Sequence, residues 1–250
     1  MGLPQMAGPA HSLGPHFFGV NIENSYFNNP VPNWTDQAWL NAIREVGIEA
    51  VRYPGGDAGN YWDWQTGTVY PRGNAAATSD SLADLAFLAK STGAIPIYNL
   101  NVMTFDNALV DNSTLAPAIQ NQLGMLSGAH RLGLPIAEIE LGNEFFWTSP
   151  DHDAAFPSAA DYTSTMKAWT AKLHLEYPDA TIAAVASIPY ATDNRTKTWN
   201  AAVLGKIPDA RAHIASFRRN HRRRHVRWHN PRSRSQLRLH RLGRHRERRN

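Results

Sequence analysis

The sequence predicts an α/β fold, and two regularities support this prediction. Short apolar runs rich in β-forming residues alternate with amphipathic stretches of helical period from about residue 17 to residue 187. The apolar runs begin at residues 17, 49, 95, 138 and 181, which leaves room for one helix between successive strands. A repeat of strand, helix and strand implies parallel strands joined by right-handed crossovers.

The individual elements follow from local residue patterns. Five strands are predicted over residues 17–23, 49–54, 95–101, 138–144 and 181–187. Four helices are predicted between them, over residues 35–46, 79–91, 114–131 and 159–176. Thr35 or Asp36 is the expected N-cap of the first helix, and the expected stop signals are Gly47, Gly93, Gly133 and Pro178. A fifth helix is expected over 195–205 and a sixth strand near 209–217.

Polar residues at the ends of the predicted strands favour a (β/α)₈ barrel. They are Glu23 and Asn24, Arg52, Asn99 and Asn101, and Asn143 and Glu144. In such a barrel, the carboxyl ends of the strands converge on the face that carries the active site. A doubly wound sheet gives a similar series of elements, but residues 18–23 are not followed by its usual glycine-rich phosphate loop. We therefore predict an incomplete barrel that contains about strands one to five or six.

Charge divides the chain near residue 210. Residues 1–210 hold 10 Lys or Arg against 20 Asp or Glu, whereas residues 211–250 hold 15 Arg, six His and a single acid, Glu247. We predict an N-terminal extension over 1–15, a partial barrel over 16–210 and a disordered basic tail over 211–250. We interpret the tail as the product of a shifted reading frame, which would also explain the missing strands. A nucleic-acid-binding arm and a solvated tail without function are the alternatives.

Composition excludes several kinds of protein. The chain has no Cys, so it has no disulfide, no thiolate metal site and no Cys nucleophile. Its His residues are scattered without metal-ligand spacing, and we expect neither a metal nor another cofactor. No apolar run reaches the roughly 18 residues of a membrane span, so we expect no membrane partner. The first residues show no secretory signal, and the localisation stays open.

The strongest chemical signal follows the fourth predicted strand. Asn143 and Glu144 come directly after a buried apolar run and directly before Phe145, Phe146 and Trp147. An aromatic setting removes water from a carboxyl group and raises its pKa, which suits a general acid. The neighbouring amide of Asn143 can exchange hydrogen bonds with a sugar hydroxyl. The simpler interpretation is a strand that ends in a solvated polar turn.

Three segments together resemble clan A glycoside hydrolases. Leu141-Gly142-Asn143-Glu144 is similar to the acid/base motif of this clan, which places an Asn-Glu pair at the end of barrel strand four. Residues 51–56 and 60–64 are similar to the second-strand region of the α-L-arabinofuranosidase and heparanase-like β-glucuronidase branches, and residues 18–23 resemble their first strand. The matches cover about residues 16–190.

The resemblance implies roles for four polar residues. Glu144 would be the proton donor to the leaving group, and Asn143 would contact the sugar 2-hydroxyl. Arg52 would orient the nucleophilic carboxylate; its structural alternative is an ion pair with Asp57 or a contact with a helix end. Glu23 would bind substrate hydroxyls, or it would be a surface carboxylate.

Aromatic residues after the second predicted strand suggest a surface for sugar stacking. Tyr61, Trp62 and Trp64 would form this platform, because the apolar faces of sugars pack on aromatic rings. Buried loop aromatics are the alternative. Asn99 and Asn101 point to one side of strand three, where they would line the site or cap the next turn.

The sequence offers no candidate for the second catalytic carboxylate. Retaining glycosidases need two carboxyl groups about 5 to 5.5 Å apart, and in clan A the second comes from strand seven. After Glu144 the chain offers only Glu176, at the end of a predicted helix, and Glu247, among arginines. We therefore predict a retaining clan A glycoside hydrolase with a carbohydrate substrate and impaired activity. The alternatives are a non-catalytic carbohydrate-binding remnant and nucleic-acid binding through the tail. Members of the resembled branches are often secreted.

Overall fold

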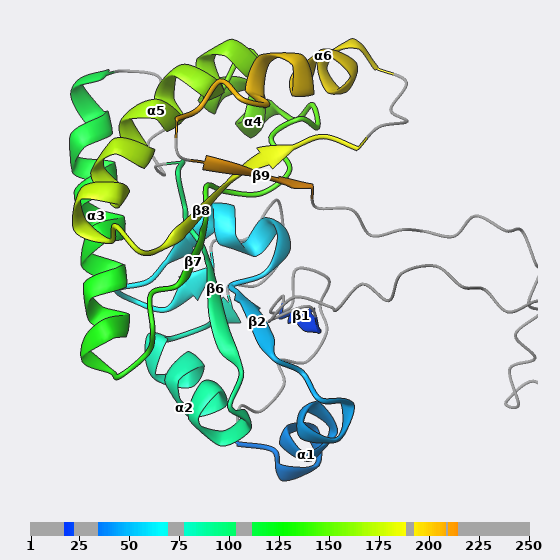
Figure 1. Ribbon diagram of the computed structural model, residues 1–250, viewed down its shortest axis with the longest axis vertical. Helices are drawn as coiled ribbons and strands as arrows, with labels where there is room; N and C mark the ends of the chain where they lie inside the picture. The colour runs from blue at the N-terminus through cyan, green and yellow to red at the C-terminus, as the bar shows by residue number, and fades with distance from the viewer. Residues whose placement is uncertain are drawn as a thin grey trace, which may run out of the picture. The chain divides into compact units, whose positions relative to one another are not determined.

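A six-stranded parallel sheet forms the centre of the fold (Figure 1). The computed structural model describes residues 18–22, 35–69, 78–103, 112–188, 193–208 and 210–214, all within the compact unit Met1–Ser216. The strands, in their order across the sheet, are β1 (Gly19–Asn21), β2 (Ala50–Tyr53), β6 (Ile95–Asn99), β7 (Glu138–Glu140), β8 (Thr181–Ala186) and β9 (Ala210–Ile214).

The strand order decides between the two folds that the sequence allowed. Each of these strands pairs in parallel with the next one along the chain, for example β2 with β6 and β7 with β8. A doubly wound sheet reverses its strand order at a switch point, whereas a barrel adds its strands consecutively. The described strands therefore follow the barrel order. Within the described residues β1 and β9 are the two edges, so these strands form an open sheet and not a closed barrel.

Helices follow the strands and pack against one another in sequence. They are α1 (Gln37–Val46), α2 (Leu82–Thr92), α3 (Asn112–Arg131), α4 (Pro150–Ala155), α5 (Ala159–Glu176) and α6 (Asn194–Val203). Contacts run from α1 to α2, α2 to α3, α3 to α5 and α5 to α6, matching the order of the strands. Figure 1 shows α2, α3 and α5 along one side of the sheet. The predicted α/β alternation is confirmed over this part of the chain.

Capping residues explain where several helices begin and end. Asp36 is the N-cap of α1, and its carboxylate accepts hydrogen bonds from the amides of residues 38 and 39. Ser81 and Asp84 form a capping box at the start of α2. Helix α5 has the predicted bounds, because Ser158 caps its start and Pro178 follows its end.

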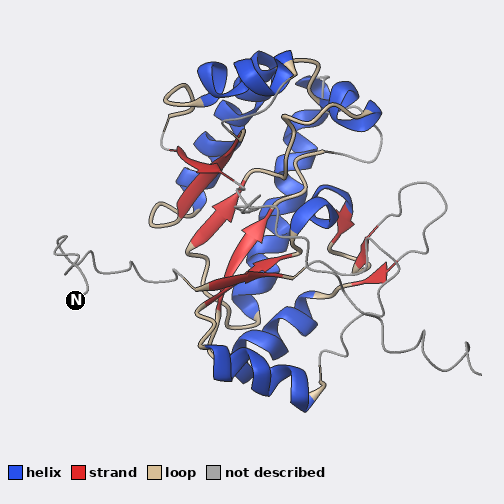
Figure 2. Ribbon diagram, turned by 90° about the vertical axis from the view of Figure 1, so that its right-hand side faces the viewer, coloured by secondary structure: helices blue, strands red, loops and turns tan. Residues whose placement is uncertain are grey.

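Two local features were not expected from the sequence. A 3₁₀ helix, η1 (Gly56–Tyr61), leads from β2 into a separate antiparallel sheet of β3 (Trp62–Asp63), β4 (Thr68–Val69) and β5 (Thr78–Ser79). Figure 2 shows these short strands beside the main sheet. Strands of two residues carry no detectable period, which is why the pattern of apolar residues did not reveal them.

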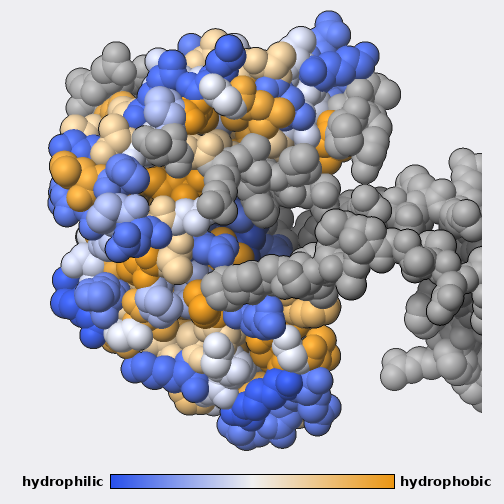
Figure 3. Space-filling model, in the orientation of Figure 1, coloured by the Kyte–Doolittle hydropathy of each residue, from blue (hydrophilic) through white to orange (hydrophobic). Residues whose placement is uncertain are grey.

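The core of this unit is continuous and rich in aromatic side chains. Trp62, Trp169, Trp199, Tyr98 and Tyr162 are among the largest fully buried side chains. On the face in Figure 3, hydrophilic residues gather over α1 at the bottom of the view. None of the described helices combines the length and the apolar character needed to cross a bilayer.

The sixth predicted strand is present. Strand β9 pairs with β8, from Ile182 opposite Ala210 to Ala186 opposite Ile214, and α6 precedes it where a fifth helix was expected. The strand continues four residues beyond position 210, where we expected the barrel segment to end. The predicted extension over 1–15 and residues 215–250 of the predicted tail lie outside the described residues.

Candidate active site

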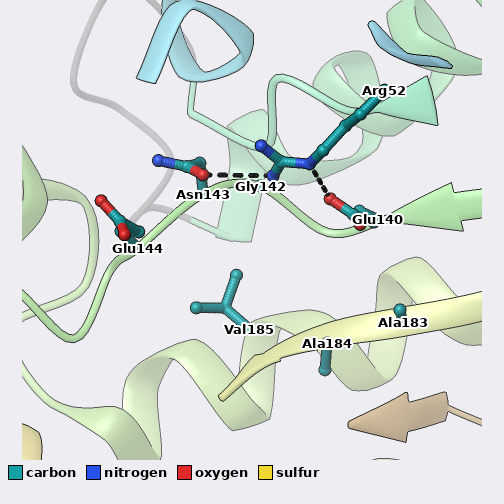
Figure 4. Close-up of a pocket in the computed structure, with 8 residues that line it drawn as sticks. All are labelled: Arg52, Glu140, Gly142, Asn143, Glu144, Ala183, Ala184 and Val185. Carbon is teal, nitrogen blue, oxygen red and sulfur yellow. Dashed lines mark hydrogen bonds and ion pairs between the residues drawn. The ribbon is translucent and has the colours of Figure 1, made fainter. Parts of the chain in front are cut away.

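A hollow opens where β2, β7 and β8 end (Figure 4). Its lining residues are Arg52, Glu140, Gly142, Asn143, Glu144, Ala183, Ala184 and Val185. Figure 4 shows the three β8 residues along one side and Arg52, Asn143 and Glu144 on the other. Three of the predicted site residues are thus brought together at the carboxyl edge of the sheet, where parallel α/β folds build their sites.

Arg52 connects three strands through its guanidinium group. Its Nε donates to Glu140 Oε2, its Nη2 donates to Asn143 Oδ1 at 3.1 Å, and its Nη1 donates to Asn21 Oδ1 at 3.1 Å. The ion pair with Glu140 is largely buried, with side-chain exposures of 13% and 5%. The structural alternative for Arg52 was an ion pair with Asp57 or a contact with a helix end. The structure shows an ion pair with Glu140 of β7, the strand that leads to the candidate acid.

Asn143 lies at the centre of the polar network and is 3% exposed. Its Oδ1 accepts from Arg52, and its Nδ2 donates to Asp57 Oδ1 at 2.9 Å. Its main-chain N–H and C=O both bond to the side-chain amide of Asn60. The orientation of the Asn143 side chain is therefore set by a cation on one side and an anion on the other.

Glu144 extends from a tightly turned main chain. Its φ is 49°, the one positive φ of a non-glycine residue among the described residues, and such a conformation costs about 1–2 kcal/mol. Gly142, two residues earlier, has a φ of 84°, and a Cβ at that position would collide with the Phe145 ring. The glycine of the Gly-Asn-Glu motif is therefore required both for its backbone conformation and for its lack of a side chain.

The environment of Glu144 favours its protonated form. Burial raises the pKa of its carboxyl above 4.5, and the negative charge of Asp57 raises it further. The positive charge of Arg52 and a hydrogen bond from the Trp147 side chain lower the pKa, but they do not outweigh burial. A carboxyl group that keeps its proton to a higher pH can act as a general acid.

The residues that follow Glu144 separate into buried and exposed aromatics. Phe145 and Phe146 are fully buried, whereas Trp147 is 42% exposed. The Trp147 amide donates to the Glu144 carbonyl at 2.9 Å, and the Trp147 carbonyl lies 3.1 Å from His152 Nδ1. The exposed Trp147 side chain thus lies next to the candidate acid, on a main chain that these contacts hold.

Arg195, at the start of α6, holds the same loop from the other side. Its guanidinium donates to the carbonyls of Phe145, Phe156 and Pro157 and pairs with Asp153 at 3.2 Å. Burial lowers the pKa of this guanidinium, and the acidic groups around it oppose the shift. Sequence reasoning missed Arg195, because its partners lie about 40 to 50 residues away along the chain.

The predicted aromatic platform does not fit the positions of its members. Trp62 is 1% exposed and donates from Nε1 to the Asp80 carbonyl at 2.8 Å, so its faces belong to the core. Trp64 lies against Gly124 of α3 and donates to Asn121 Oδ1 at 3.0 Å. Tyr61 is 9% exposed and donates to Asp151 Oδ2 at 2.9 Å. Tyr61 and Trp62 therefore match the alternative of buried loop aromatics, and Trp64 is half-buried against α3.

The remaining predicted site residues are placed as follows. Asn101 is 5% exposed; its Nδ2 donates to the Trp62 carbonyl at 3.2 Å and its Oδ1 accepts from the Met103 amide at 3.1 Å, so it holds loops together. Glu23 lies outside the described residues. Glu176 lies exposed at the end of α5, and Glu247 is also outside the described residues. The part of the chain that the structure describes contains no group of three His, Cys, Asp or Glu that could hold a metal ion.

These features define a class of fold: consecutive parallel strands with following helices, and a polar site at their carboxyl edge. The structure is similar to AbfB, a family 51 α-L-arabinofuranosidase from Bifidobacterium longum, with a TM-score of 0.58 and 18% identity. This match covers 86% of the present chain and 46% of AbfB. An α-L-arabinofuranosidase from Thermotoga maritima gives a TM-score of 0.49 at 19% identity, over 70% of this chain and 37% of that one.

The chain therefore spans less than half the length of these two enzymes. The likeness to AbfB concerns the fold. Neither a protein-family model nor a curated protein matches the sequence.

Proposed function

We propose that the chain carries the acid half of a retaining glycoside hydrolase site of the clan A type. The observation that carries this proposal is the position of Glu144, a partly buried carboxyl group with a raised pKa in the hollow at the carboxyl edge of the sheet. Glu144 would protonate the glycosidic oxygen as the bond to the sugar breaks. The substrate would be an oligosaccharide or polysaccharide.

Neighbouring residues would bind the sugar and orient the second catalytic carboxylate. Asn143 is fixed between Arg52 and Asp57, so its amide would meet a ring hydroxyl in a defined orientation. Arg52 would orient a nucleophilic carboxylate, as the resemblance to clan A implies. Trp147 would pack against the leaving group, since it is exposed and adjacent to the group that protonates the leaving oxygen.

We propose further that the isolated chain turns over slowly. Besides Glu144, the acidic residues that the structure describes in this polar network are Glu140, bonded to Arg52, and Asp57, which accepts from Asn143. Neither is assigned as a nucleophile. The alternative is a chain that binds carbohydrate without hydrolysing it, which calorimetry with oligosaccharides would detect as binding without product.

The test compares aryl glycosides with good leaving groups and alkyl glycosides with poor ones, for the parent chain and for Glu144→Gln. Loss of a general acid is expected to slow hydrolysis of the alkyl substrates by about 10²- to 10⁴-fold and of the aryl substrates much less. Glu176→Gln, on the exposed end of α5, is the control and should leave both rates unchanged.

Equal losses on both substrates, or none, would exclude Glu144 as the proton donor. Rapid turnover that depends on Glu144 would instead show that the chain supplies a nucleophile.

Two further proposals concern the Arg-rich segment, of which residues 215–250 lie outside the described residues. Because β9 continues the strand order to Ile214 in the present frame, a shifted reading frame predicts that another frame of the coding DNA continues the barrel beyond codon 214. A nucleic-acid-binding arm predicts affinity that falls steeply with salt and is lost when residues 215–250, which follow β9, are deleted.

A further inference from the structure

Asn60 makes an unusual pair of hydrogen bonds to the chain segment that carries Glu144. Its Nδ2 donates to the Asn143 carbonyl at 2.8 Å, and its Oδ1 accepts from the Asn143 amide at 2.9 Å. One side chain thus satisfies both main-chain polar groups of the residue directly before the candidate acid. Asn60 is 1% exposed, so water does not compete for these bonds.

The two bonds act where the main chain is most tightly turned. Gly142 and Glu144, on either side of Asn143, both have positive φ values, 84° and 49°. A non-glycine residue keeps such a conformation only when its surroundings hold it there. Asn60 binds one polar group of each of the two peptide units between these residues, namely the N–H and the C=O of Asn143.

Asn60 itself is carried by a firmly attached element. It belongs to η1, which Asn99 of β6 holds at its start. Asn99 Nδ2 donates to the carbonyl of Gly56, the first residue of η1, at 3.1 Å and to the carbonyl of Pro54, just before η1, at 3.3 Å. A Cβ on Gly59 would collide with the Asn99 amide, so the backbone of η1 packs directly on β6. Asn60 is therefore a fixed support and not a flexible surface side chain.

The same bonding pattern occurs a second time, at the end of β8. The Ser187 amide donates to Asn200 Oδ1 at 2.7 Å, and Asn200 Nδ2 donates to the Ser187 carbonyl at 3.0 Å. Ser187 does not line the hollow. Asn200 therefore offers a control in which the same two bonds are lost away from Glu144.

We propose that Asn60 is a positioning residue, which sets the orientation of the Glu144 carboxyl by clamping the main chain of Asn143. The proposal rests on the proposed function of Glu144 as the acid. Asn60 touches neither the carboxyl group nor the substrate in this scheme, and it acts through the backbone alone.

The experiment follows the titration of the Glu144 carboxyl by carbon NMR in the full chain, for the parent, Asn60→Ala and Asn200→Ala. Freeing the Asn143 backbone is expected to expose Glu144 to water and to lower its titration midpoint by about half a pKa unit or more. Asn200→Ala should change the midpoint by less than about 0.2 units. It should nevertheless lower the melting temperature about as much as Asn60→Ala does, because both variants lose the same two hydrogen bonds.

If Asn60→Ala fails to fold, Asn60→Ser and Asn200→Ser form a second pair of variants. The serine side chain is uncharged and can still make one hydrogen bond. A midpoint that stays within about 0.2 units of the parent in the folded Asn60 variants, or that shifts equally in the Asn200 variants, would overturn the proposal. The titration needs no turnover, so it separates this proposal from the hydrolysis test of Glu144.

Discussion

The ends of β7 and β8 use the same structural device for different purposes. Both strands lie side by side in the sheet, and after each of them an asparagine side chain binds the N–H and C=O of one residue. After β7 the chain continues to a strained carboxyl residue within a network of charges. On β8, Ala183, Ala184 and Val185 give the hollow an apolar wall. The asparagine fixes the main chain at both strand ends, and the surrounding side chains decide whether that end is charged or apolar.

We expect the largest difference in stability between variants of β7 and variants of β8 when a buried charge of β7 is removed. Glu140 of β7 is the buried partner of Arg52, and Ala183 of β8 lies opposite it in the sheet. Glu140→Gln leaves a buried guanidinium without its counter-ion and should lower the free energy of unfolding by about 3–5 kcal/mol.

Denaturant unfolding measures this change, with Ala183→Ser as the matched variant, which we expect to cost less than about 1 kcal/mol. Similar losses in the two variants would show that the charge network does not distinguish the ends of β7 and β8.

Ionisation of Glu144 should have a smaller effect on stability, which depends on pH. The folded-state pKa of Glu144 is raised above 4.5, so its favourable contribution is full below the unfolded pKa and is lost as the pH rises through the folded value. Glu144→Gln has no ionisable group at this position. Relative to the parent, its melting temperature should therefore rise between pH 4 and pH 7, by about one degree, because Glu144 is only partly buried.

Melting curves at several pH values measure this difference. A relative melting temperature that falls over the same range would mean that the ionised form of Glu144 is the one that the fold stabilises.

The fold could be predicted from local signals because they are strong along the main sheet. Helix α5 has its predicted bounds, with Ser158 and Pro178 as caps and stops, and each predicted strand of the described part overlaps an observed one. Asn143 and Glu144, which the sequence singled out because an apolar strand leads straight into them, both line the hollow. In each case the residues that determine the structure lie within a few positions of one another.

The rest of the site depends on contacts that a local pattern does not contain. Asn60 meets Asn143 across 83 positions of sequence, and Glu140 meets Arg52 across 88. Trp62 was expected to stack on sugars, but the carbonyl of Asp80 and the surrounding core decide its position. Aromatic residues next to a site motif do not show from sequence whether their faces meet solvent or the core.

The most direct test of the central claim is the titration of the Glu144 carboxyl in the unmodified chain. We propose that burial raises the pKa of this carboxyl above that of an ordinary glutamic acid, so that the group keeps a proton to donate at a higher pH. Carbon NMR of glutamate-labelled protein, with Glu144→Gln to assign the resonance, gives the midpoint. We predict a midpoint above 4.5. A midpoint at or below 4.5 would contradict the assignment of Glu144 as the general acid.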